Sequence, residues 1–293
     1  MEENRKAEKK RSSFSGRLGY VLAVAGSAVG LGNIWRFPYL AAKYGGGIFL
    51  LVYLVLVVTF GYALIVSETA LGRMTRRSPI GAFAKFGKGL PFRFGGWINA
   101  AVPLLIVPYY CVIGGWVCKY LFEYLRGGTM ELAQDAYFST FLSSAGGVEG
   151  WFLLFAALTS SISLAETGVS TFQDQLGWSR KKCTALVAAI LLGLGTLCAL
   201  GYNALDFLQV LGMDMLDFFD FLTNSVMMPI GALATCFLIT RAVGLNAIAQ
   251  EMELSSAFRR KRMYGVFMKY FAPICLLIIL VSSLLNVFGV ISM

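Results

Sequence analysis

The chain contains no histidine and few charged side chains: Asp, Glu, Lys and Arg make up 14% of its 293 residues. The missing imidazole removes the commonest general base and metal ligand, and no nucleophile motif or nucleotide-binding loop occurs. We therefore expect neither an enzyme nor a cofactor. The six cysteines lie within apolar runs or at their edges, so they indicate packing rather than an extracellular disulfide framework.

Long apolar runs fill much of the chain, in which 57% of the residues are hydrophobic and the mean hydropathy is +0.70. A soluble domain of this length is far less apolar. Seven segments are long enough to cross a hydrocarbon core of ~30 Å. They are 18–42, 47–70, 97–125, 150–173, 183–202, 216–240 and 264–291. The predicted fold class is an all-α polytopic membrane protein with seven transmembrane helices.

The net charge of +9 has a topological explanation that requires no nucleic acid as a partner. If the N-terminus is cytoplasmic, every Lys and Arg except Arg36, Lys43, Lys119 and Arg126 falls on the inner side. We predict a multi-pass protein of the cell (inner or plasma) membrane with a cytoplasmic N-terminus and an outer C-terminus. Residues 1–17 form a basic arm that either binds the anionic inner leaflet or stays solvated.

The stretch from Gly26 to Pro38 interrupts the first apolar segment with glycines, an asparagine, an arginine and a proline. Unpaired backbone groups are costly in hydrocarbon, so irregular backbone at this depth must be lined by protein or water. Unwinding at 26–33 would free carbonyl oxygens for a small cation, and a half-helix beginning near Leu31 would point its amides at an anion. On spacing alone, Gly26 and Gly30 could instead form a small-xxx-small packing face.

The stretch from Arg17 to Gly47 closely resembles the first span of the neurotransmitter:sodium symporter family, of the LeuT-like, bacterial eleven-span type. Other segments continue the resemblance. They are Glu68 to Arg73 in the second span, Tyr109, Tyr110 and Trp116 in the third, Ala156 to Ser161 as in the family's eighth span, and Asp220 to Asn224 as in its tenth. The resemblance implies a partial LeuT-type inverted-repeat fold with a broken first helix. It also implies sodium-coupled symport of an amino acid or related small zwitterion.

The resemblance assigns binding residues one by one. A sodium site would use the carbonyls of Gly26, Val29 and Ala156 with the hydroxyls of Thr159 and Ser160. A partial second sodium site would use Ala28 and Asn33. The amides of Leu31 and Gly32 with the Tyr110 hydroxyl would hold the substrate carboxylate. Gating ion pairs would join Arg36 to Asp220 outside and Arg11 to Asp174 inside, with Phe14 where the family usually has tryptophan. Thr159, Ser160, Tyr110 and Arg11 each also have a purely structural or topological interpretation.

The resemblance omits the family's spans four to seven, and the join falls near Ser143 to Gly150. The expected organisation is an arm at 1–17, three helices at 18–126, an outer loop at 127–149, and four helices at 150–293 equivalent to spans eight to eleven. A short interfacial helix is expected near Ile80 to Phe86. Gly193 and Gly195 are expected to be close-packing glycines rather than a second helix break.

Three interpretations remain open at this point. The first is an internally truncated symporter that binds sodium but performs no coupled transport alone. The second is a non-transporting membrane protein that associates with a full-length relative or with itself. The third is a deletion introduced by gene assignment or cloning. A seven-helix receptor has only the number of spans in its favour.

Overall fold

A computed structural model describes residues 18, 19, 21, 25, 30, 32–134, 136–144, 147–156, 159–254 and 257–290. The described part is helical, and several helices contain π-helical turns, denoted η. The first half comprises η1 Gly32–Arg36, α2 Phe37–Lys43, α3 Gly47–Leu56, η2 Val57–Gly61, α4 Tyr62–Thr75, α5 Pro79–Phe86, α6 Leu90–Leu125, α7 Thr129–Leu132 and α8 Tyr137–Ser143. The second half comprises α9 Gly147–Ala156, α10 Thr159–Leu176, α11 Arg180–Leu200, α12 Met215–Asp220, η3 Phe221–Met227, α13 Met228–Leu238, η4 Ile239–Val243, α14 Leu245–Glu253, α15 Lys261–Val266, η5 Phe267–Phe271 and α16 Ala272–Val287.

Five of the described helices are long and apolar enough to cross a membrane. They are Gly47–Thr75, Leu90–Leu125, Arg180–Leu200, Met215–Val243 and Lys261–Val287. Each coincides with one of the predicted segments, so the fold class of an all-α polytopic membrane protein is confirmed. The number seven stays a prediction, because segments 18–42 and 150–173 both contain residues outside the described structure.

The predicted span 150–173 is described in two parts, α9 up to Ala156 and α10 from Thr159. Residues 157 and 158 between them lie outside the described residues. The predicted sodium ligands of this span therefore lie at the edges of the described parts.

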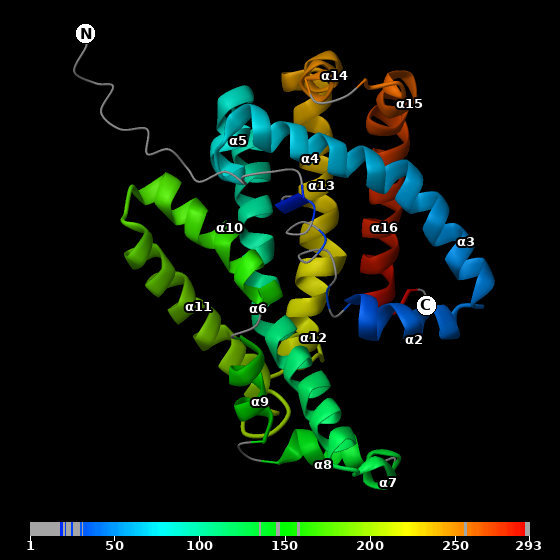
Figure 1. Cartoon of the computed structure of the whole chain (residues 1–293), viewed down its shortest axis with the longest axis vertical. Coiled ribbons are helices and arrows are strands. Elements are labelled where there is room, and N and C mark those ends of the chain that lie inside the picture. Colours follow the sequence, from blue (N-terminus) through cyan, green and yellow to red (C-terminus); the bar gives the residue numbers. More distant parts are fainter. Residues whose placement is uncertain are drawn as a thin grey trace.

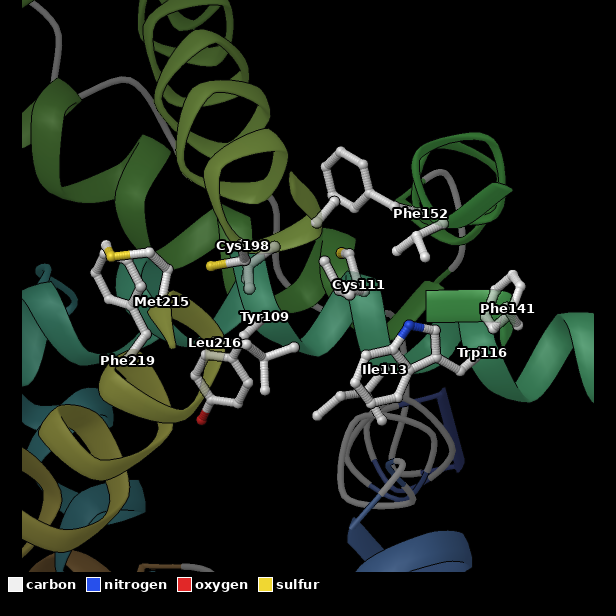
Figure 2. Packing of buried hydrophobic residues seen from close by; sticks show 14 residues of the cluster. Tyr109, Cys111, Ile113, Trp116, Phe141, Phe152, Cys198, Met215, Leu216 and Phe219 are labelled. Atoms are coloured by element: carbon white, nitrogen blue, oxygen red, sulfur yellow. The ribbon is translucent and has the colours of Figure 1, made fainter. Parts of the chain in front are cut away.

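Helix α6 runs through the middle of the described structure, between the other helices (Figure 1). It contacts α9, α5, α11, α10 and α13, and its most apolar window is half buried. The largest core cluster joins α6 to α9, α11 and α12, with Val112, Phe152 and Cys198 at 0–2% exposure. Figure 2 shows these side chains gathered along α6. By contrast, only 6% of the apolar window in Gly47–Thr75 is buried within the described structure.

Glycines allow aromatic rings to enter the helix surfaces in this core. A Cβ on Gly195 would lie 2.3 Å from the Phe152 ring, so this glycine is close-packed as expected. Gly193 has no described atom within 4 Å of such a Cβ, so its expected packing role has no support among the described residues. The two positions are separated by about 200° around the helix and therefore face different surroundings. α11 is continuous across both, which agrees with the absence of a break there.

The two long loops differ in how well the sequence predicts them. The short helix expected near Ile80 to Phe86 is present as α5, with Ile80 and Phe83 buried. Segment 127–149, expected as a loop, also contains the short helices α7 and α8. Phe141 of α8 is buried in the same cluster as Trp116 of α6, so local burial of apolar side chains organises this segment.

A buried hydrogen bond joins the second and last long helices, and we expect its removal to cost little. Ser67 Oγ and the Tyr264 hydroxyl are 2.7 Å apart, and Ser67 Oγ also donates to the Ala63 carbonyl at 2.8 Å. Tyr264→Phe leaves that second bond intact, so the free energy of unfolding should fall by about 0.6 kcal/mol. Tyr270→Phe, at an exposed tyrosine of the same helix, should change nothing. Thermal unfolding of both variants measures the difference, and a loss equal in both would contradict it.

Candidate functional site

A local hydrogen-bonded turn joins Gly30 and Asn33 within the first predicted span, between helical Ala25 and η1. The backbone amide of Asn33 donates to the Gly30 carbonyl at 3.1 Å, and the backbone amide of Gly30 donates to the side-chain Oδ1 of Asn33 at 3.2 Å. Gly30 itself is not helical, and η1 begins at Gly32, next to the predicted start of the half-helix. The Asn33 side chain, a predicted sodium ligand, thus accepts a backbone hydrogen bond and ties the turn to the helix that follows.

Tyr110 of α6 lies against this turn. Its hydroxyl is so close to Gly30 that a Cβ added there would lie 3.1 Å from the oxygen. The Tyr110 ring also packs on Phe155 of α9, with ring centroids 5.9 Å apart. The structure therefore brings Tyr110 to the start of the half-helix, where the amide of Gly32 is also found. Leu31, the third predicted carboxylate ligand, lies outside the described residues.

The predicted sodium sites fall partly outside the described structure. Gly26, Ala28 and Val29 are not among the described residues, and neither are the side chains of Ala156, Thr159 and Ser160. The backbone places Ala156 at the end of α9 and Thr159 at the start of α10. Phe155, the residue before Ala156, contacts Tyr110, so this part of α9 lies on the same side of α6 as the predicted carboxylate site.

Arg36 and Asp220 form an ion pair across 184 positions of sequence. Arg36 Nη1 lies 2.9 Å from Asp220 Oδ2 and 3.2 Å from Oδ1. Their side chains are 52% and 25% exposed, so this is a partly solvated contact. It joins the end of η1 to the end of α12, which are the predicted outer-gate positions.

Three polar side chains that the sequence did not assign to the site extend a hydrogen-bond network from Asp220. Asn224 Nδ2 donates to Asp220 Oδ1 at 2.6 Å and to the Tyr109 hydroxyl at 3.0 Å. That hydroxyl is 3.1 Å from Thr223 Oγ1. The available signals were the i, i+4 spacing of Asp220 and Asn224 and the position of Tyr109 directly before Tyr110.

Of the two residues of the predicted inner ion pair, only Asp174 is among the described residues. Asp174, near the end of α10, accepts a hydrogen bond from the Ser78 amide at 2.7 Å. This contact connects α10 to the residue that precedes α5. Arg11 lies outside the described residues.

A first predicted span interrupted at Gly30, a central α6 and an ion pair between Arg36 and Asp220 are typical of an integral membrane protein of the transporter class. The profile of the Sodium:neurotransmitter symporter family matches residues 11–136 and 148–290. The chain belongs to this family.

Individual relatives match this chain over only part of their own length. An uncharacterized sodium-dependent transporter of Bacillus subtilis, YhdH, is 37% identical over 137 residues, which are 47% of this chain and 30% of that protein. The human sodium- and chloride-dependent GABA transporter 2 is 39% identical over 115 residues, 39% of this chain and 19% of that protein. The chain thus spans less than a third of the length of these relatives.

A solved structure shows the same fold. The crystal structure of MhsT in complex with L-phenylalanine superposes with a TM-score of 0.81 and 20% identity, covering 93% of this chain and 100% of that chain. The partial LeuT-type architecture predicted from the sequence is therefore confirmed.

Proposed function

We propose that this chain is an internally truncated form of a sodium-coupled symporter of an amino acid or related small zwitterion, which binds sodium but does not perform coupled transport alone. The observation that carries the proposal is the Arg36–Asp220 ion pair beside the Tyr110–Gly30 contact. A cation site and a carboxylate site at one break in a helix are what coupling of sodium to a zwitterion requires. Family membership supports sodium as the coupling ion.

The proposal places one nearly complete sodium site between the first helix and the α9–α10 junction. Gly26 and Val29 would supply carbonyls from one side, and Ala156, Thr159 and Ser160 would supply oxygens from the other. An ion shared by two helices stabilises the state in which they are close together. The profile match breaks between residues 136 and 148, which supports a join near Ser143 to Gly150 and the lack of spans four to seven.

Sodium is expected to stabilise the purified chain more than potassium does. At a sodium concentration about tenfold above Kd, ligand binding raises the free energy of unfolding by about 1.4 kcal/mol. The difference between NaCl and KCl at equal ionic strength, measured by thermal unfolding in detergent or nanodiscs, reports this binding. The double variant Thr159→Val/Ser160→Ala should lose it, because both hydroxyl ligands are removed.

Thr59→Val/Ser282→Ala is the matched control for that experiment. Both of its hydroxyls donate to carbonyls of their own helices, at 2.6 and 3.0 Å. The control should keep the full sodium response. Equal stabilisation by sodium and potassium, or an unchanged response in the Thr159/Ser160 variant, would refute the sodium site.

A second candidate function is a non-transporting membrane protein that associates with a full-length relative. The low burial of the Gly47–Thr75 and Lys261–Val287 windows, 6% and 11%, favours it, because these helices have apolar faces available for another subunit. Co-purification with a complete family member would support this function. A transcript that is longer than the coding sequence across Ser143 to Gly150 would instead identify the deletion as an artefact of gene assignment or cloning.

A further inference from the structure

The two oxygens of Asp220 have different partners in the structure. Oδ2 faces Arg36 Nη1 at 2.9 Å, whereas Oδ1 is held by Asn224 Nδ2 at 2.6 Å and lies 3.2 Å from Arg36. The carboxylate is thus bound from two sides. Arg36 approaches from the first helix, and Asn224 approaches from one turn further along the same helix as Asp220.

Behind Asn224, the hydrogen bonds continue into the core in a single direction. Thr223 Oγ1 donates to the Phe219 carbonyl at 2.8 Å, which leaves its lone pairs for the Tyr109 hydroxyl at 3.1 Å. The Tyr109 oxygen then accepts from Asn224 at 3.0 Å. The two amide protons of Asn224 are therefore both used, one on Tyr109 and one on Asp220. Each donor in this row of hydrogen bonds therefore has an acceptor.

This chain of hydrogen bonds is rigid at its inner end. The Tyr109 side chain is 4% exposed and Thr223 is fully buried, and both are fixed by the core cluster around α6 and by helix η3. Arg36, at the other end, is half exposed and belongs to the short first helix. One partner of the ion pair is thus held in place, while the other has room to move.

We infer that Asn224, supported by Tyr109, is a positioning residue of the gate and orients Asp220 to receive Arg36. The inference rests on the proposed function, in which the Arg36–Asp220 pair is that gate. A free aspartate samples several rotamers, and fixing one of them before Arg36 arrives lowers the entropic cost of pairing. The carboxylate also keeps a hydrogen-bond donor when Arg36 leaves, so the open gate does not leave it without a partner.

The same helix sets the spacing between this gate and the carboxylate site. Tyr109 bonds the gate network, and its neighbour Tyr110 contacts Gly30. Because both tyrosines belong to one continuous α6, the hydroxyl that holds the gate network and the hydroxyl proposed for the carboxylate lie at a fixed spacing.

The reactivity of Arg36 toward phenylglyoxal tests the inference on the full chain in nanodiscs. Peptide mass spectrometry follows the modification rate, with Arg126 as the internal reference. Asn224→Leu should raise the rate at Arg36 about fivefold, the equivalent of one hydrogen bond. Asp220→Asn should raise it at least as much, and Asn224→Leu should add nothing further in that background. Tyr109→Phe, which removes a single hydroxyl, should raise it by a smaller factor.

Asn99→Leu is the matched control variant. Asn99 Nδ2 also connects α6 to α13, donating to the carbonyls of Gly95 and Gly231 at 2.9 and 3.1 Å, but it does not contact the gate. It should leave the Arg36 rate unchanged, which separates positioning from general loosening of the helix pair. If Asn224→Leu does not fold, Tyr109→Phe decides alone.

Two results would overturn the inference. One is a native Arg36 rate in Asn224→Leu, or in Tyr109→Phe where only that variant folds, while Asp220→Asn reacts faster. The other is an equal increase in Asn99→Leu. The assay needs neither sodium nor transport, so its failure is distinct from failure of the proposed function, which the sodium-specific stabilisation tests.

Discussion

Gly115→Val is expected to destabilise the chain by about 3 kcal/mol or to prevent its folding. A Cβ at Gly115 would lie 2.7 Å from the backbone carbon of Trp151 and 2.8 Å from the backbone nitrogen of Phe152. Both atoms belong to α9, so no side-chain rotation relieves the contact. Helices α6 and α9, which share one of the most extensive contacts in the described structure, would have to separate.

Gly193→Val is the control for that substitution. It makes the same change within an apolar helix, but no described atom lies within 4 Å of the added Cβ. Its free energy of unfolding should stay within about 0.5 kcal/mol of the native value. Thermal unfolding of the two variants in the same detergent makes the comparison. Equal midpoints would show that α6 and α9 do not pack as the structure has them.

The spans were predictable because each is a long apolar run, and hydrocarbon thickness sets the required length. The different surroundings of Gly193 and Gly195 were not predictable. Sequence shows that both lack a side chain, whereas only the arrangement of α9 against α11 decides which one is needed.

The candidate site was also predictable from the sequence only in part. Asp220 follows Arg36 by 184 residues, so only the family resemblance connects the two residues before the structure does. Tyr109 and Asn224 were read as motif residues without a role. Their hydrogen bond depends on the distance between α6 and η3, which no local pattern contains.

Proteoliposomes that contain only this chain are expected to show no sodium-driven amino acid uptake. Alternating access requires a path that is closed on one side in each state, and the family spans four to seven would supply part of its walls. The helix Gly47–Thr75, with 6% of its apolar window buried, shows how much of its surface lacks a neighbour within the described structure. An ion site that stays open to both sides cannot couple one gradient to another.

The measurement is uptake of a labelled amino acid mixture with an inward sodium gradient, compared with an equal gradient of potassium. A full-length family member reconstituted in parallel verifies the assay, and Asp220→Asn in this chain serves as the matched variant. Because the proposed sodium site does not depend on spans four to seven, sodium should still stabilise a chain that transports nothing. Sodium-dependent uptake that disappears in Asp220→Asn would contradict the prediction. It would mean that the proposed gate between Arg36 and Asp220 suffices for coupling, or that a second copy of the chain supplies the walls proposed to be missing.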